Sequence, residues 1–153
     1  MLMMFLQQGS NTMSSVKELL SVCVEMGIES NTLTKDESKG YLSKIIEKYN
    51  PEKMTGHLSI GGQSITIPLE EHEFTYSKNL KCQPLLVFFD QDGIDRKKVV
   101  RIENGQLLCD ILENSFGMEY FISNEQVDYL IAVNWYAIEG VGAAKEWLGK
   151  LTK

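Results

Sequence analysis

Leu85-Leu-Val-Phe-Phe89 is the stretch that decides the fold, because five consecutive apolar residues are typical of a central strand buried on both faces. Turn chemistry follows in Asp90-Gln-Asp-Gly93, and residues 97–102 return as the partner strand. Residues 118–123 and 127–135 also have the composition of strands and are separated by a short polar segment. The sequence therefore predicts an antiparallel sheet around 85–89.

Helical patterns flank this predicted sheet. Ser15-x-x-Glu18 and Thr34-x-x-Glu37 have capping-box spacing and precede apolar stripes, which predicts a pair of N-terminal helices. Gly27 should end the first helix and Asn50-Pro51 the second. Two further helices are predicted over 107–116, with Gly117 as its cap, and over 143–151.

A hairpin is predicted before the central strand. Leu58 and Ile60, then Ile65 and Ile67, alternate around Gly61-Gly62. The order of elements contains no βαβ repeat, so the predicted fold class is α+β. We expect a mostly antiparallel sheet of about six strands with an N-terminal helix pair, one internal helix and a short C-terminal helix.

Composition limits the class of protein. The chain has 153 residues, of which 43% are hydrophobic and 24% are charged, as in a single globular domain. No apolar run approaches the ~18 residues of a membrane span. The net charge of −6 argues against nucleic-acid and anionic-membrane partners. The three cysteines are an odd number and lie far apart, which favours reduced thiols in a cytoplasmic protein.

The N-terminus does not look like a signal peptide. A signal peptide has a basic region followed by a longer apolar stretch, whereas the apolar stretch Met1–Leu6 is only six residues long and no basic region accompanies it. Sequence typical of an ordered helix begins just after Met13, which is an alternative for the natural first residue of the protein. We expect residues 1–12 to be a non-native or disordered extension and residues 13–153 to form a single α+β domain.

Motifs for cofactors are incomplete. Gly140-Val-Gly-Ala-Ala-Lys145 lacks the Ser or Thr that follows the lysine of a Walker loop, and it lacks the third small residue of a dinucleotide fingerprint. Asp90-Gln-Asp-Gly-Ile-Asp95 resembles a calcium loop, but its glycine is at the fourth position instead of the sixth, and Arg101 stands at the twelfth position, where a calcium loop has glutamate. His57 and His72 have no zinc-ligand spacing. We predict no cofactor, no metal and no catalytic residue.

An enzyme is nevertheless the alternative interpretation. Its site, that of a small hydrolase or transferase, would have to be assembled in three dimensions from Glu70, His72, Cys82 or Cys109. A deep pocket that holds two of these side chains within hydrogen-bonding distance would favour this interpretation.

The order of charges is unusual. Residues 102–144 contain seven carboxylates and six aromatic residues but no Lys or Arg, directly after a strand that holds four bases (Arg96, Lys97, Lys98 and Arg101). Acids beside aromatic residues suit a basic protein partner. We therefore predict a partner-binding surface of exposed acids and aromatic anchors, comprising Glu119, Glu125, Asp128, Trp135 and Tyr136.

Two other interpretations of the same stretch are open. The aromatic residues could face the core while the acids face water and the basic strand neutralises them. A homodimer that buries Trp135 and Tyr136 across a two-fold axis is the other interpretation.

Three segments carry a resemblance in layout: Leu85-Leu-Val-Phe-Phe-Asp90, Gly117-Met-Glu-Tyr-Phe-Ile122 and Asp128-Tyr-Leu-Ile-Ala-Val-Asn-Trp135. Together with the helical N-terminal part, they resemble small bacterial α+β proteins of the SMI1/KNR4-like and related toxin-immunity group. The resemblance covers mainly residues 85–140, and it implies a non-enzymatic binding protein without implying any site residue. The predicted function is a cytoplasmic, non-catalytic protein-binding module, such as an immunity or regulatory protein that masks a basic partner.

Overall fold

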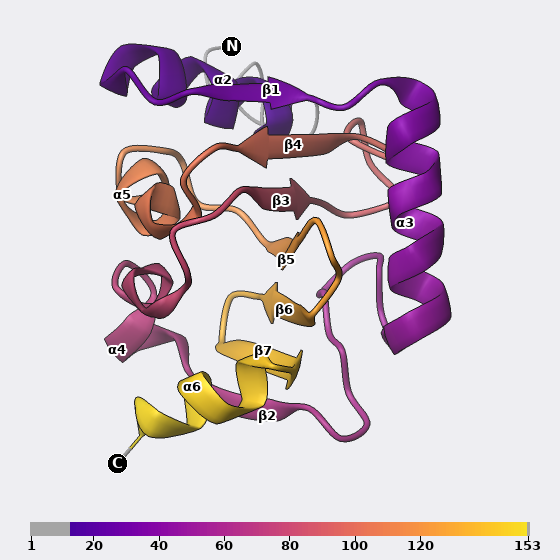
Figure 1. Ribbon diagram of the computed structural model, residues 1–153, viewed down its shortest axis with the longest axis vertical. Helices are drawn as coiled ribbons and strands as arrows, with labels where there is room; N and C mark the ends of the chain where they lie inside the picture. The colour runs from indigo at the N-terminus through magenta and orange to yellow at the C-terminus, as the bar shows by residue number, and fades with distance from the viewer. Residues whose placement is uncertain (1–12, 153) are drawn as a thin grey trace, which may run out of the picture.

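An antiparallel sheet of seven strands forms the centre of the computed structural model, which describes residues 13–152 (Figure 1). The strands are β1 (Ser30–Thr32), β2 (Ile65–Pro68), β3 (Leu85–Phe88), β4 (Val99–Ile102), β5 (Tyr120–Asn124), β6 (Tyr129–Val133) and β7 (Ala137–Gly142). Their spatial order is β1-β4-β3-β5-β6-β7-β2, and every pair of neighbours is antiparallel. The α+β class and the antiparallel sheet are confirmed, with one strand more than expected.

The central position of residues 85–89 is confirmed. β3 lies between β4 and β5, and all four of its residues are buried. Because side chains of a strand alternate between its faces, Leu85 and Val87 enter one core while Leu86 and Phe88 enter the other. The continuous apolar run is therefore explained by two cores, one on each face of the sheet.

Helices cover both faces of the sheet. They are α2 (Ser15–Met26), α3 (Lys35–Tyr49), α4 (Leu69–His72), α5 (Leu108–Glu113) and α6 (Ala144–Lys150), with single 3₁₀ turns η1 (Tyr76–Asn79) and η2 (Gly105–Leu107). Buried side chains of α2, α5, α6 and η1 join the first core. Those of α3 join the second core, together with Leu58 and Ile60 from the segment that follows α3.

The predicted N-terminal helix pair is present, with one change in its capping. Thr34 and Glu37 form the expected capping box of α3. The cap of α2, however, is Ser14 rather than Ser15, since the Ser14 hydroxyl accepts a hydrogen bond from the amide of Lys17. Gly27 ends α2 in the left-handed conformation, as predicted.

The predicted hairpin around Gly61-Gly62 is wrong. Residues Ile65–Pro68 do form a strand, but this strand pairs with β7 at the edge of the sheet. The preceding arm forms only an isolated bridge between Lys53 and Ser59. Leu58 and Ile60 alternate because both side chains enter the second core from a loop, not because they belong to a paired strand.

Other predictions lie at the limits of the elements or outside them. The helix predicted over 107–116 ends at Glu113 with Asn114 as its C-cap, so Gly117 does not cap it. Strands β1 and β7 were not predicted from the sequence. No helix within residues 13–152 combines the length and the apolar character that crossing a membrane requires. The predictions for residues 1–12 lie outside the described residues.

Candidate functional site: an acidic and aromatic cleft at one end of the sheet

The five predicted partner-binding residues lie at opposite ends of the central strands. Glu119 directly precedes β5, and Trp135 and Tyr136 form the turn between β6 and β7 at the same end, where Tyr120 is paired with Val133. Glu125 and Asp128 belong to the turn between β5 and β6 at the other end. The five residues of β5 lie between Glu119 and Glu125, so six steps along the chain separate the two acids by roughly 20 Å. The residues therefore form two groups.

The aromatic residues of the base-free stretch are divided between core and surface. Tyr120, Phe121 and Tyr129 are buried, as the core interpretation expects. Trp135 is 49% exposed and Tyr136 is 74% exposed, as the partner-binding interpretation expects. Only the end of the sheet that carries Glu119 therefore presents aromatic side chains from this group to solvent.

The acids of the other group already have partners. Arg101 of the basic strand contacts Glu125, with 3.3 Å between Nε and Oε2, and also forms an ion pair with Glu103. The carboxylate of Asp128 accepts a hydrogen bond from the side-chain amide of Asn124. At this end, the basic strand neutralises a nearby acid, as the core interpretation expects.

A cleft of about 540 Å³ lies at the Glu119 end and brings together five parts of the chain. We call it the acidic cleft. Six large apolar side chains and three carboxylates line it: Met13, Phe89, Ile94, Phe116, Met118 and Trp135, with Asp90, Asp95 and Glu119. Its lining residues include no Lys or Arg within the described part of the chain. Apolar lining with a few fixed polar groups is typical of binding sites.

The first two carboxylates are held by hydrogen-bond donors. Asp95 is 5% exposed, and its two oxygens accept hydrogen bonds from the Ser14 hydroxyl, at 2.5 Å, and from the amide of Ser15, at 2.7 Å. Asp90 accepts from the amides of Gly56, at 3.0 Å, and Asp92, at 2.8 Å. Both carboxylates are therefore fixed in position by the start of α2 and by neighbouring loops.

Glu119 is not the exposed acid that we expected. Its side chain is only 9% exposed, because one oxygen accepts a hydrogen bond from the amide of Leu58 and the other contacts Nδ1 of His57 at 2.9 Å. The His57 ring in turn lies edge-on to the Tyr136 ring, with 5.7 Å between centroids. Glu119 thus links the exposed His57 and Tyr136 to the end of the sheet.

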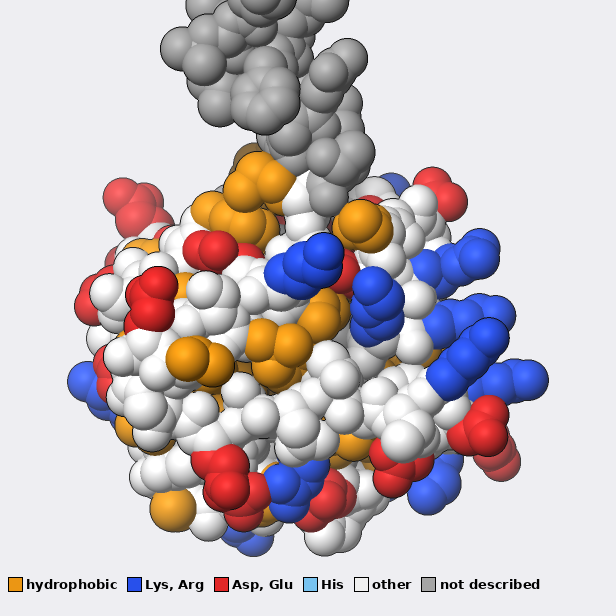
Figure 2. Space-filling view, turned by 90° about the horizontal axis from the view of Figure 1, so that it is seen from above, with side chains coloured by type: hydrophobic (Ala, Val, Ile, Leu, Met, Phe, Trp, Pro, Cys, Tyr) orange, Lys and Arg blue, Asp and Glu red, His pale blue; other side chains and the backbone are white. Residues whose placement is uncertain are grey.

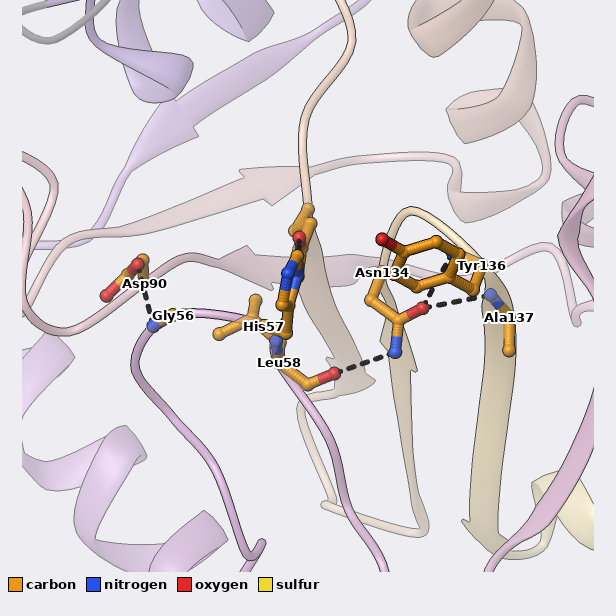
Figure 3. A network of polar contacts seen from close by, with 8 residues as sticks. Gly56, His57, Leu58, Asp90, Asn134, Tyr136 and Ala137 are labelled. Atoms are coloured by element: carbon orange, nitrogen blue, oxygen red, sulfur yellow. Dashed lines mark hydrogen bonds and ion pairs between the residues drawn. The ribbon is translucent and has the colours of Figure 1, made fainter.

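The loop that begins at Gly56 crosses the strand ends and is held there by side chains. Figure 3 shows His57 and Leu58 between Asp90 on one side and Asn134 on the other. The amide group of Asn134 donates to the carbonyl of Leu58 and accepts from the backbone of the β6–β7 turn. Side chains at the ends of three strands therefore position both the loop and the exposed aromatic turn.

The ring of Trp135 packs beside Gly117. A methyl group added to Gly117 would lie 3.2 Å from Cζ3 of the Trp135 ring, so the ring rests against a position where a side chain would not fit well. Since about half of Trp135 is exposed, the supported indole offers a surface at the edge of the acidic cleft.

Positive charge is unevenly distributed on the described surface. Seen from above, Lys and Arg side chains gather on the side where α3 lies in Figure 1, while hydrophobic side chains reach the surface nearer the middle (Figure 2). Within residues 13–152, no Lys or Arg forms an ion pair with Asp90, Asp95 or Glu119. The basic side chain that contacts a carboxylate of the acidic cleft is His57, whose Nδ1 atom lies 2.9 Å from Oε2 of Glu119.

The residues of the alternative enzyme site make separate contacts. Nε2 of His72 lies 3.7 Å from Oε2 of Glu71. The sulfur of Cys109 contacts the amide of Ser77 and the carbonyl of Glu73, and burial raises the pKa of this thiol. Within the described residues, no hydrogen bond or ion pair joins any two of the four proposed catalytic residues, Glu70, His72, Cys82 and Cys109.

The acidic side chains of the cleft are not arranged as metal ligands. Within residues 13–152, no three His, Cys, Asp or Glu side chains lie close enough to share a metal ion. The three carboxylates of the acidic cleft therefore do not form a group that could hold a metal ion. In the sequence, Asp90 and Asp95 belonged to a predicted turn that resembles an incomplete calcium loop, and no local signal placed them beside Glu119 and Trp135.

Comparisons of the chain with protein-family models, with curated proteins and with solved structures found no match. The resemblance to the toxin-immunity group stays a prediction.

Proposed function

We propose that this protein is a non-catalytic protein-binding module, of the immunity or regulatory kind, and that its acidic cleft receives a basic and apolar segment of a partner protein. One observation carries this proposal: three fixed carboxylates without a Lys or Arg partner in the described chain lie beside a half-exposed tryptophan. Other exposed apolar residues adjoin it, namely Met13, Ile94 and Tyr136.

Charge complementarity supports a basic partner. Asp90 and Asp95 accept a hydrogen bond from an amide or hydroxyl donor on each oxygen, while Glu119 accepts from an amide on one oxygen and contacts the His57 ring with the other. A carboxylate oxygen with one such contact keeps a second lone pair for an incoming cation. A carboxylate group that is fixed before binding loses little conformational freedom in the complex. A negative cleft also accelerates the encounter with a basic protein, at a rate that falls as salt is added.

The aromatic residues support a protein rather than a small ion as the occupant. Trp and Tyr are enriched among the residues that dominate interface energies. Trp135 and Tyr136 are exposed side by side in one turn, at the mouth of a cleft that has apolar lining. Glu125 and Asp128 lie at the other end of β5, so we expect them to contribute less to binding than the sequence alone predicts.

The experiment is a selection from a phage-displayed library of random twelve-residue peptides on the immobilised protein. We expect the enriched peptides to combine Arg or Lys with aromatic or aliphatic residues. Their binding should weaken at least tenfold in the charge-neutralised variant Asp90→Asn/Glu119→Gln. It should be unchanged in Glu125→Gln, the matched control at the other end of the same strand.

Three outcomes would overturn the proposal: no enrichment over an uncoated surface, enriched peptides that are acidic, or equal binding by wild type and the double variant. Sedimentation of the free protein tests the homodimer. A dimer that becomes a monomer in Tyr136→Lys would assign this surface to self-association instead. Circular dichroism confirms that each variant is folded before its binding is interpreted.

A further inference from the structure

We infer that the acidic cleft selects arginine over lysine, by stacking a guanidinium group on Trp135 while the cleft carboxylates accept its N–H groups. This inference rests on the proposed function, because it names the side chain through which the basic partner is recognised. Three features of the cleft carry it: the support of the indole, the spread of the carboxylates and the apolar lining.

The tryptophan is placed as a platform. Its ring rests against Gly117, where an added methyl group would approach Cζ3 to 3.2 Å, and about half of the side chain is open to solvent. A planar guanidinium stacks on such a ring, and arginine makes cation–π contacts with tryptophan more often than lysine does.

The spread of the carboxylates suits a wide cation. Asp90 and Asp95 come from the β3–β4 loop, and Glu119 comes from the segment before β5. Within the described residues, they do not form a group of three ligands that could hold a metal ion. Guanidinium has five N–H donors in a planar fork, so it can reach acceptors that lie apart, whereas an ammonium acts as a single compact charge.

The apolar lining adds to the preference. Phe89, Phe116 and Met118 reach the cleft from the same segments that carry the carboxylates. A cation that enters must lose part of its hydration, and guanidinium is more weakly hydrated than ammonium. Both cations carry the same formal charge, so the difference between them measures stacking, hydrogen-bond geometry and hydration.

The test uses peptides that the library selection has already shown to bind. Each basic residue of such a peptide is exchanged, Arg→Lys or Lys→Arg, at constant charge. Binding is followed through the fluorescence of Trp135 in the variant Trp147→Phe, which leaves one tryptophan in the chain. We expect Arg→Lys at one peptide position to weaken binding at least tenfold, and the arginine form to shift the emission of Trp135.

A second variant isolates the platform. In Trp135→Leu, which keeps an apolar side chain at the cleft, labelled peptides followed by fluorescence anisotropy should bind with less than a threefold preference for arginine. Binding of the lysine forms should change little. In Trp135→Phe, which keeps an aromatic ring, part of the preference should return.

The outcomes separate the two proposals. Peptides that bind the cleft equally well with lysine or arginine overturn the arginine inference and leave the proposed function standing. A preference for arginine that is unchanged in Trp135→Leu also overturns it. A selection that enriches no peptide overturns the proposed function, and the arginine inference with it.

Discussion

Glu139 should be among the side chains on which the stability of the fold depends most. It lies in β7 and is only 9% exposed. Its Oε1 atom accepts three hydrogen bonds: from the hydroxyl of Ser59 at 3.0 Å, from the amide of Ile60 at 2.9 Å and from the amide of Gly61 at 3.1 Å. One carboxylate oxygen thus holds the loop that was expected to be a hairpin arm.

The expected loss follows from the donors that an exchange leaves without a partner. In Glu139→Ala, the Ser59 hydroxyl can rotate toward water, but the two backbone amides cannot move without the loop. A buried donor that loses its acceptor costs about 1–3 kcal/mol. We therefore expect Glu139→Ala to lower the free energy of unfolding by about 3 kcal/mol, a large part of the ~5–15 kcal/mol of a typical domain. Glu139→Gln keeps an acceptor oxygen and should lose about 1 kcal/mol.

Urea denaturation followed by circular dichroism measures these differences. Glu125→Ala is the control, because it removes a carboxylate whose ion pair with Arg101 is exposed, and such pairs contribute about 0–1 kcal/mol. The reasoning is refuted if Glu139→Ala loses no more than this control. It is also refuted if the alanine and glutamine variants are equally stable, since the retained acceptor would then make no difference.

The remaining predictions concern thiols and phenols. Iodoacetamide should alkylate only the exposed Cys82 in the native protein, because Cys23 and Cys109 are buried and burial raises the pKa of both thiols. Mass spectrometry should find one adduct in buffer and three in urea. More than one adduct in buffer would contradict this prediction. Burial also raises the pKa of Tyr76 and Tyr120 well above the usual value of 10. The folded state keeps both phenols protonated, so their stabilising effect is present below about pH 10 and is lost above it, as the unfolded chain releases its protons. Absorbance at 295 nm reports all six tyrosines, including the exposed Tyr136, so the curve of the wild type is compared with that of Tyr76→Phe. The absorbance that Tyr76 contributes should appear at the same pH as the loss of circular dichroism, and its appearance before unfolding would count against the buried pair.

Local patterns were sufficient for the parts of the fold that local physics determines. The run Leu85–Phe89 predicted a strand buried on both faces because no other arrangement covers five consecutive apolar residues so well. Thr34 and Glu37 predicted the start of α3 because a capping box needs only residues three apart.

The hairpin prediction failed because the deciding partner is remote. Leu58 and Ile60 show strand-like alternation, but their loop is held by Glu139, almost eighty residues later in the chain. A backbone amide that bonds to a distant side chain leaves no pattern in its own neighbourhood. The sequence around Ile60 therefore predicts a strand, although the contact with Glu139 holds it as a loop.

The candidate site was predictable only in part for a similar reason. The charge order drew attention to Glu119, Trp135 and Tyr136, and the structure brings these three together. The same reasoning added Glu125, which is close in sequence but lies beyond the far end of β5. Residues that lie close together in the sequence, and that a count of charges treats as one group, can therefore lie at opposite ends of a strand.

The structure also indicates which side chain is the best probe of function. Every carboxylate of the acidic cleft binds a backbone amide, so an exchange at Asp95 or Glu119 removes a charge and loosens the fold at once. Trp135 is different: it is half exposed, and it rests on Gly117 without a hydrogen bond among those the structure gives for residues 13–152. Its exchange should cost far less stability than the ~3–5 kcal/mol of a buried tryptophan. Weaker binding in a Trp135 variant of nearly normal stability can therefore be assigned to the lost contact, whereas weaker binding in a carboxylate variant needs the stability measurement beside it.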